Sequence, residues 1–199
     1  MADKNKARDA RPMTLCSAAM PRWVAFVLLA ASAHVLGGCG LGWRVGAGLH
    51  ANTEGSVAGE LYAGANMGVG FSDRQALEAG VELDASIRSN PARLGTGLTD
   101  RVDFRSESDH EGLGWMVGAY GGVRGLFLDG NLLEDRLGGS FDLLPTLSLS
   151  DHTYKHVGIE VQGGVATLDH DPEHEKAPDR AEFAVRLFYE VFTLERGHF

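Results

Sequence analysis

The chain has 199 residues with 18 basic and 27 acidic side chains, a formal net charge of −9 at pH 7. Residues 39–199 hold 13 basic and 25 acidic side chains, which is a net charge of −12. So acidic a segment repels phosphate backbones, which excludes nucleic acid as an expected partner. These residues are numerous enough to form one domain with a substantial core.

The first 38 residues have the outline of a secretory leader. Five basic residues precede or border an apolar run over residues 23–36: Lys4, Lys6, Arg8, Arg11 and Arg22. This run is shorter than the roughly 20 residues that a spanning helix needs, so we expect it to be cleaved. Translation starting at Met20 would give a leader of ordinary length. The predicted domains are therefore a signal peptide at 1–38 and one β-barrel domain at 39–199.

A cysteine closes the apolar run at Leu36-Gly37-Gly38-Cys39. A leucine and two small residues before a cysteine form a lipobox, so the leader resembles that of a bacterial lipoprotein precursor. The resemblance implies processing and sorting by the lipoprotein machinery, acylation of Cys39 with chains such as palmitate, and anchoring in the bacterial outer membrane. The alternative is a buried structural cysteine. In either case Cys39 is the sole cysteine after processing, which rules out an intramolecular disulfide.

Alternating apolar and polar residues dominate the rest of the chain. In residues 76–88, for example, Leu77, Val81 and Leu83 share one face while Glu78 and Glu82 share the other. A strand sorts such residues onto two sides, whereas a helix scatters them. The same pattern predicts eight strands, at 42–50, 56–71, 76–88, 98–106, 113–128, 139–149, 156–168 and 181–195.

The predicted connections alternate in length. Longer ones are expected at 51–55, 89–97, 129–138 and 169–180, and shorter ones at 72–75 and 150–155. Residues 130–139 are interpreted as a short helix or a loop. This order fits an antiparallel up-and-down barrel. The weakest predicted strand, 98–106, has few apolar residues, and losing it would break an even-numbered barrel.

The residues on the polar face decide which side of the barrel is inside. Glycine suits the crowded lumen of a narrow barrel, and mixed charges can pair across it. The glycines of this face are Gly46, Gly48, Gly64, Gly80, Gly118, Gly122, Gly158 and Gly164. The predicted lumen charge network consists of Arg44, Glu60, Glu82, Arg124, Glu160, Arg186 and Glu190.

The large apolar residues of the opposite face would then meet lipid. They include Trp43, Leu61, Leu83, Trp115, Phe141, Ile159, Val161, Phe183, Leu187 and Val191. With the aromatic Phe199 at the end of the sequence, residues 42–199 resemble the small eight-stranded outer-membrane β-barrel proteins. The resemblance implies insertion into membrane lipid with the barrel-assembly machinery as a partner. The alternative is a soluble, lipid-tethered barrel or sandwich with the apolar face inside, binding a small apolar ligand.

No arrangement in the sequence predicts catalysis. His170 and His174 are weak candidate metal ligands in an acidic stretch whose spacing matches no known ligand loop, so no metal or other cofactor is expected. Ser150, Asp151 and His152 are neighbours that point apart, and His156 lacks the His-x-Ser-Asn motif of lipid A deacylases. The acids of the polar face favour ion pairing over acid–base chemistry. We therefore expect an outer-membrane lipoprotein with a structural or surface-interaction role, with a lipid-modifying enzyme as a further alternative.

Overall fold

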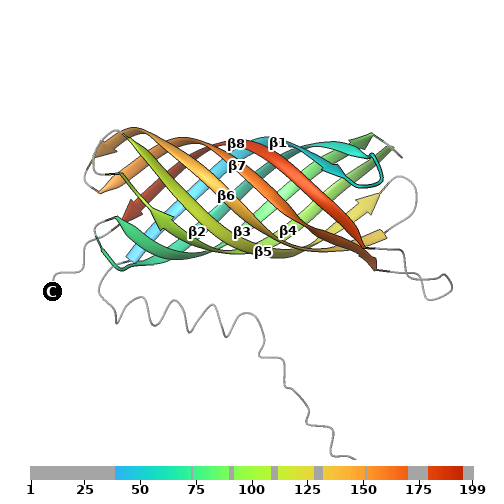
Figure 1. The fold of residues 1–199 in the computed structure, drawn as a ribbon, viewed down its shortest axis with the longest axis horizontal. Helices are drawn as coiled ribbons and strands as arrows, with labels where there is room; N and C mark the ends of the chain where they lie inside the picture. Colours follow the sequence, from blue (N-terminus) through green and yellow to red (C-terminus); the bar gives the residue numbers. More distant parts are fainter. Residues whose placement is uncertain are drawn as a thin grey trace, which may run out of the picture.

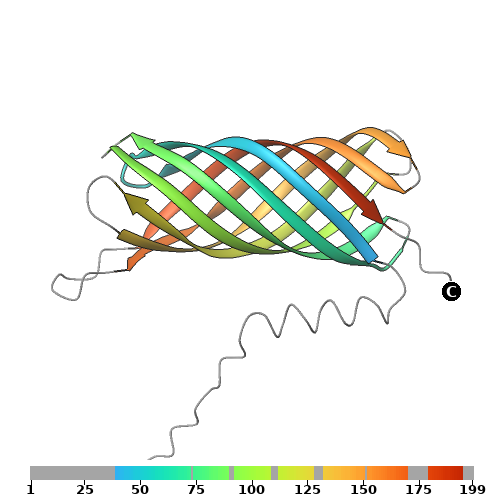
Figure 2. The same ribbon diagram turned by 180° about the vertical axis from the view of Figure 1, so that it is seen from behind.

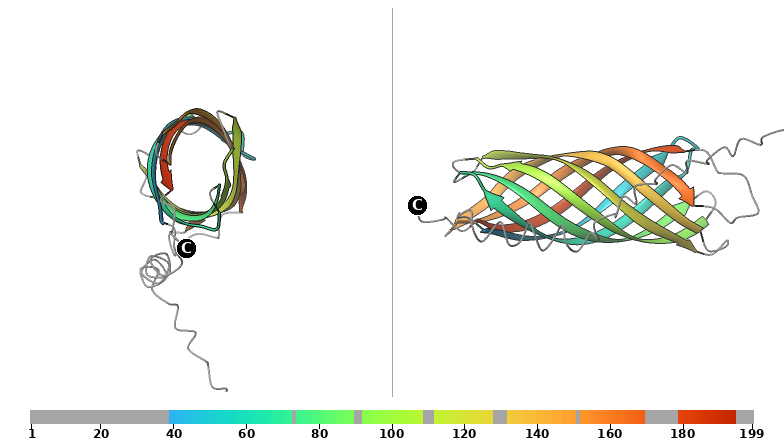
Figure 3. Two further views of the ribbon diagram at one scale, coloured as in Figure 1. Left: turned by 90° about the vertical axis from the view of Figure 1, so that its left-hand side faces the viewer. Right: turned by 90° about the horizontal axis from the view of Figure 1, so that it is seen from below.

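A computed structural model describes residues 39–72, 74–89, 92–108, 112–127, 132–150, 152–169 and 179–194. Its strands are β1 (Cys39–Asn52), β2 (Val57–Gly70), β3 (Gln75–Ser89), β4 (Ala92–Ser106), β5 (Leu113–Phe127), β6 (Leu132–Ser150), β7 (Thr153–Asp169) and β8 (Arg180–Leu194). Each strand pairs antiparallel with its neighbours in sequence, and β1 pairs with β8 to close a barrel (Figure 1). Seen end-on, the strands form a complete ring (Figure 3).

The eight-stranded antiparallel up-and-down barrel confirms the predicted fold. The alternation of apolar and polar residues favours this fold, because one face of each strand points into the lumen and the other points outward. In β3 the inward side chains from Glu78 to Arg88 are buried, whereas Leu83 and Ile87 are exposed on the outside. Closure leaves no strand edge unpaired.

Two predicted connections are wrong. Residues 92–97, expected in a loop, form the first part of β4, and residues 132–139, expected as a helix or loop, begin β6. In β4 the inward positions are Gly95 and Gly97, which hide the alternation from an apolar pattern. In β6 the outward Asp135 interrupts the apolar face, while the inward Glu134 and Arg136 are buried. The strands are therefore longer, and the connections before β4 and β6 shorter, than expected.

The two ends of the barrel differ in what they contain. The end where β1 begins and β8 ends, here called the terminal end, also holds the connections after β2, β4 and β6 (Figure 2). There, His152 adopts a left-handed backbone with φ 64° between β6 and β7. The opposite end, here called the loop end, holds the other connections, where Gly55 turns the chain after β1 with φ 78°. Among the described residues, no helix has the length and hydropathy needed to cross a membrane.

Candidate functional site

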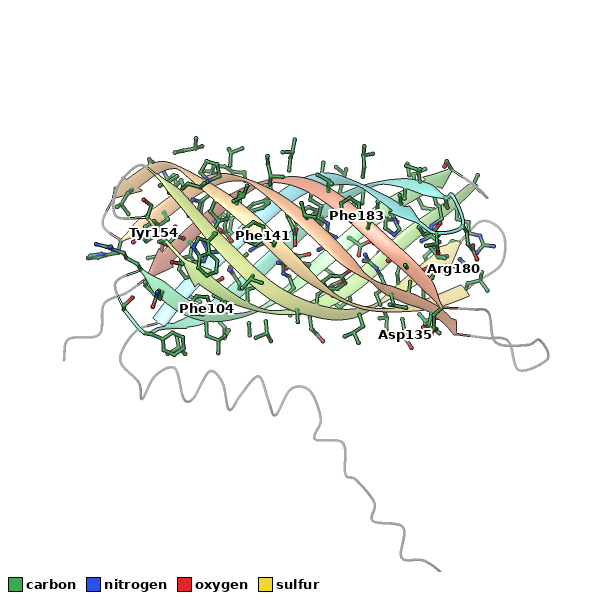
Figure 4. The ribbon with its side chains drawn as sticks, in the orientation of Figure 1. Phe104, Asp135, Phe141, Tyr154, Arg180 and Phe183 are labelled. Atoms are coloured by element: carbon green, nitrogen blue, oxygen red, sulfur yellow. The ribbon has the colours of Figure 1, made fainter. Side chains whose placement is uncertain are left out.

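The outer surface of the barrel is a nearly continuous apolar belt. Large side chains project from the wall on all strands (Figure 4), and Leu61, Ile87 and Leu137 are 66%, 70% and 70% exposed. The large apolar residues assigned to this face by the sequence are half-exposed or exposed. Water does not favour so large an apolar area on a monomeric protein, whereas lipid does.

Aromatic side chains gather on the outside near the terminal end. Trp43 lies against Tyr189 and Phe104 against Trp115, each pair with ring centroids 5.7 Å apart. All four lie within five residues of a strand terminus at that end. Such rings are enriched where a membrane meets water, so this girdle is typical of a membrane interface.

The lumen is filled by ion pairs together with a smaller number of buried apolar and aromatic side chains. At its centre the Arg101 guanidinium donates to Glu82 at 2.8 Å and to Glu160 at 2.5 Å. Arg44 donates to Asp142 at 3.1 Å and to Glu190 at 3.0 Å. Every one of these charged side chains is buried.

A second layer of pairs lies nearer the loop end. Arg186 donates to Glu60, to Glu82 at 3.0 Å and to Glu160 at 3.4 Å. Arg124 donates to the other oxygen of Glu60 at 3.1 Å. Each of the seven residues expected in the lumen network thus lies inside the barrel and forms an ion pair with another of the seven.

The network is larger than the sequence analysis proposed. Its further buried members are Glu78, Asp84, Arg88, Arg101, Asp103, Arg105, Glu107, Glu134, Arg136, Asp142 and Glu182, with His50 and His156 beside them. The sequence could have identified several of these residues, because residues an even number of positions apart lie on the same face of a strand. Asp84 and Arg88 share the face of Glu82 in this way. In all, the described lumen buries seven arginines and eleven carboxylates, so neighbouring acids share arginines.

Both ends of the network include a histidine. At the loop end, His50 Nε2 lies 2.7 Å from Glu182 Oε1, and Arg136 donates to the other oxygen of Glu182 at 3.0 Å. At the terminal end, His156 lies 3.1 Å from Glu107 through Nε2 and 3.4 Å from the Thr146 hydroxyl through Nδ1. His156 is completely buried, so its imidazole has no direct access from solvent, whereas Thr146 is partly exposed.

Glu107 follows β4 and is bonded to Arg105 as well as to His156. Arg105 donates to the Glu107 carboxylate at 2.7 Å. Burial alone raises the pKa of Glu107, but the hydrogen bond with His156 and the charge of Arg105 outweigh it and hold that pKa below its usual range. Glu107 therefore stays ionised at neutral pH.

Aromatic rings support the guanidinium groups inside the lumen. The Arg186 guanidinium lies 4.4 Å from the ring centre of Tyr62, and that of Arg105 lies 4.2 Å from the ring centre of Phe192. Stacking of this kind stabilises a cation that has lost its water. It also fills the space between the ion pairs.

Little free volume is left between these side chains. A cavity of about 10 Å³ lies beside Arg44, Glu82, Arg101 and Asp103 and has room for about one water molecule. A larger, open cavity of about 580 Å³ lies at the terminal end, lined by Ser72, Arg74, Gln75, Ser106 and Glu107. Ion pairs that cross the lumen, such as Arg44 with Asp142 and Arg101 with Glu160, thus occupy the described interior.

Three of the other residues considered as sites cannot be placed, and the rest lie in different surroundings. His170 and His174, like Asp151, lie outside the described residues, which themselves contain no cluster suited to a metal ion. His152 is exposed in its turn, whereas His156 is buried in the lumen. Cys39 begins β1 opposite Val69 on β2, so the barrel starts directly at the predicted lipidation site.

Comparison with known proteins extends to the fold alone. No protein-family profile and no curated protein sequence matches the chain. The barrel is similar to the crystal structure of Neisserial surface protein A, with a TM-score of 0.51 and 10% identity over 79% of this chain and 98% of that one. A crystal structure of the outer membrane enzyme PagL matches with a TM-score of 0.47 and 12% identity over 74% of this chain and 97% of that one.

Proposed function

We infer that this protein is an outer-membrane lipoprotein whose barrel is embedded in lipid, with a structural or surface-interaction role. The observation that carries the proposal is the distribution of polarity, with an apolar belt outside and a charged lumen inside. This is the arrangement of transmembrane barrels and the reverse of a soluble barrel that binds an apolar ligand. Because ion pairs fill the lumen, passage of solutes is not part of the proposed role.

The acyl chains on Cys39 would act together with the barrel. Since β1 begins at Cys39, a lipid on this residue lies at the terminal end, close to the aromatic girdle. A periplasmic position of the terminal end places these chains in the inner leaflet beside the barrel wall. Two membrane attachments hold a protein far more firmly than one acyl chain.

Removing the lipid separates the two attachments. We expect a Cys39→Ala variant, exported through a cleavable non-lipoprotein signal, to stay in the outer-membrane pellet after carbonate extraction. It should also migrate differently on gels with and without boiling, whereas labelled palmitate should be incorporated only by the parent chain. Release of the variant as a folded periplasmic protein would contradict the embedded barrel, and an unlabelled parent would contradict lipidation.

A further inference from the structure

Among the described strand residues, two carboxyl groups face outward, where a lipid-embedded barrel is apolar: Asp135, near the loop end of β6, and Asp100. Asp100 is in the middle of β4, with eight strand residues before it and six after. Its side chain points outward between Leu98 and Val102, which are 44% and 52% exposed. The position of this carboxyl matters only if the barrel is embedded, so any role given to Asp100 rests on the proposed function.

Asp100 has no partner among the described residues of its own barrel. No hydrogen bond or ion pair joins it to another described residue, although every buried carboxylate of the lumen has an arginine or histidine neighbour. Among the described strand residues, the outward face carries one basic side chain, Lys155, which lies near the terminal end in β7. An unpaired carboxyl at the middle of the lipid-facing belt is costly, which favours a partner from outside the chain.

The outer surface beside Asp100 has a projecting side chain on the β3 side and a patch of small residues, here called the hollow, on the β5 side. Val81 on β3 and Gly121 on β5 lie directly opposite Asp100 in the strand register. Leu83, two residues beyond Val81, stands out with 63% exposure. Gly121 lacks a side chain, and beside it on the outer face lie Ala119 and Gly139, with the exposed Leu137 opposite Gly121 on β6.

Symmetry makes these features complementary between two copies. Copies in one membrane point the same way, so a two-fold axis between them runs along the membrane normal and relates residues at equal depth. An axis beside Asp100 places β3 of each copy against β5 of the other, with Leu83 over the hollow at Gly121. It also brings the two Asp100 carboxyl groups together. When two carboxyl groups share a proton, one donates a hydrogen bond and the other accepts it, so such a pair is self-complementary.

We propose that the β3–β5 face around Asp100 is an interface for a second copy of this chain. Close approach over small residues and hydrogen bonds between polar groups are what associate segments within a membrane. The pair satisfies both carboxyl groups without any charge from the lumen. The proposed interface needs both the hollow and the Asp100 carboxyl, and each can be altered by a substitution that leaves the lumen residues unchanged.

Disulfide trapping tests the two-fold axis directly. In outer membranes treated with a mild oxidant, the full-length Asp100→Cys chain should form a species of twice the monomer mass, because residue 100 meets its own counterpart. The matched control is Gly163→Cys, which faces outward on β7, away from the proposed interface, and whose new side chain meets no atom within 4 Å. It should remain monomeric.

Substitutions that introduce no cysteine test the chemistry of the proposed interface. Asp100→Leu should weaken dimerisation roughly tenfold in detergent sedimentation, the effect of losing membrane hydrogen bonds. Asp100→Asn should retain the dimer, since an amide also donates and accepts. Gly121→Leu should disrupt it by filling the hollow. The barrel tolerates a Cβ there, because the nearest atom, Leu137 Cδ1, would lie 3.7 Å away.

Gel migration with and without boiling, measured on the same samples, separates the possible failures. A folded, embedded Asp100→Cys barrel that forms no dimer overturns the interface and leaves the proposed function intact. An adduct of any other mass means that a different protein covers this face, which also overturns the two-fold assignment. A chain absent from the membrane contradicts the proposed function itself.

Discussion

At the scale of the residue, Arg101 shows how the barrel tolerates charges in its interior. Its guanidinium touches Glu82, Glu160 and Asp103, and the Ser140 hydroxyl accepts a further hydrogen bond at 3.1 Å. Burying an arginine is costly unless carboxylates replace its water. Glu82 and Glu160 also pair with Arg186, whereas the ion pair of Asp103 is with Arg101.

Removal of Arg101 should therefore be severe. Arg101→Ala leaves Asp103 buried without its arginine and removes one of the cations beside Glu82 and Glu160, and we expect the free energy of unfolding to fall by about 3–5 kcal/mol. Urea titration of the purified barrel in detergent, followed by gel mobility, measures the change. The control is Arg180→Ala, which breaks a 2.8 Å pair with the half-exposed Glu54 and should cost at most about 1 kcal/mol. Equal losses in the free energy of unfolding would show that ion pairs in the lumen contribute no more to stability than the exposed Arg180–Glu54 pair.

Glu107 gives the barrel an acid-sensitive contact at the terminal end. Its folded-state pKa lies below the unfolded value of about 4.3, so its stabilising contribution is complete above that pH. The contribution is lost as the pH falls through the folded pKa. A Glu107→Gln variant should consequently be less stable than the parent at pH 7, and the difference in stability should narrow as the pH falls below about 4. A difference that stays constant over urea titrations from pH 7 to pH 3 would contradict this assignment.

At the scale of the element, glycines let the strands and lumen side chains pack closely. A Cβ on the inward Gly122 would come within 2.8 Å of the Thr99 Cα and still closer to the Leu98 carbonyl oxygen. These are backbone atoms, which cannot rotate away. A Cβ on the outward Gly163 would meet nothing within 4 Å. The two positions therefore separate crowding from the general cost of changing a strand glycine.

We expect Gly122→Ala to lower the free energy of unfolding by about 1–3 kcal/mol, as overpacking does. Gly163→Ala should leave stability unchanged or raise it slightly, because glycine weakens a strand. Urea titration of both variants provides the comparison. Comparable losses in the two would mean that crowding at the inner wall is not what selects glycine.

Alternation in the sequence predicted most of this architecture, and its failures have physical causes. The strand expected at 76–88 is β3 to within one residue at each end, because its apolar face is unbroken. The starts of β4 and β6 were missed where inward glycines or the outward Asp135 interrupt the pattern. The seven network residues can be identified because they occupy alternate positions along their strands, but their ion-pair partners depend on the register between strands. A single sequence does not reveal that register.

At the scale of the whole molecule, the protein is a closed barrel with a filled, charged lumen and an apolar exterior. Cross-strand hydrogen bonds close the wall, and ion pairs join opposite sides of the lumen, as between Arg44 on β1 and Asp142 on β6. The interior therefore links strands that are distant in the ring. A filled lumen is consistent with the proposed structural role and does not suit a pore.

A filled lumen predicts that no ions pass. The purified protein reconstituted into planar bilayers should give no conductance steps, under conditions in which a general porin conducts. Reproducible single-channel steps would require the ion pairs at Arg44 and Arg101 to open. They would contradict the description of the lumen as sealed.

The central claim is that the outer belt of the barrel meets lipid, and tryptophan quenching tests it most directly. The sequence has three tryptophans, and Trp43 and Trp115 remain in a chain that begins at residue 39. Both face outward, with 46% and 39% exposure. In vesicles whose acyl chains carry bromine, the fluorescence of a Cys39→Ala form should be strongly quenched, with little further quenching by aqueous iodide. Emission that iodide quenches and bromolipid does not would place this surface in water and contradict the account.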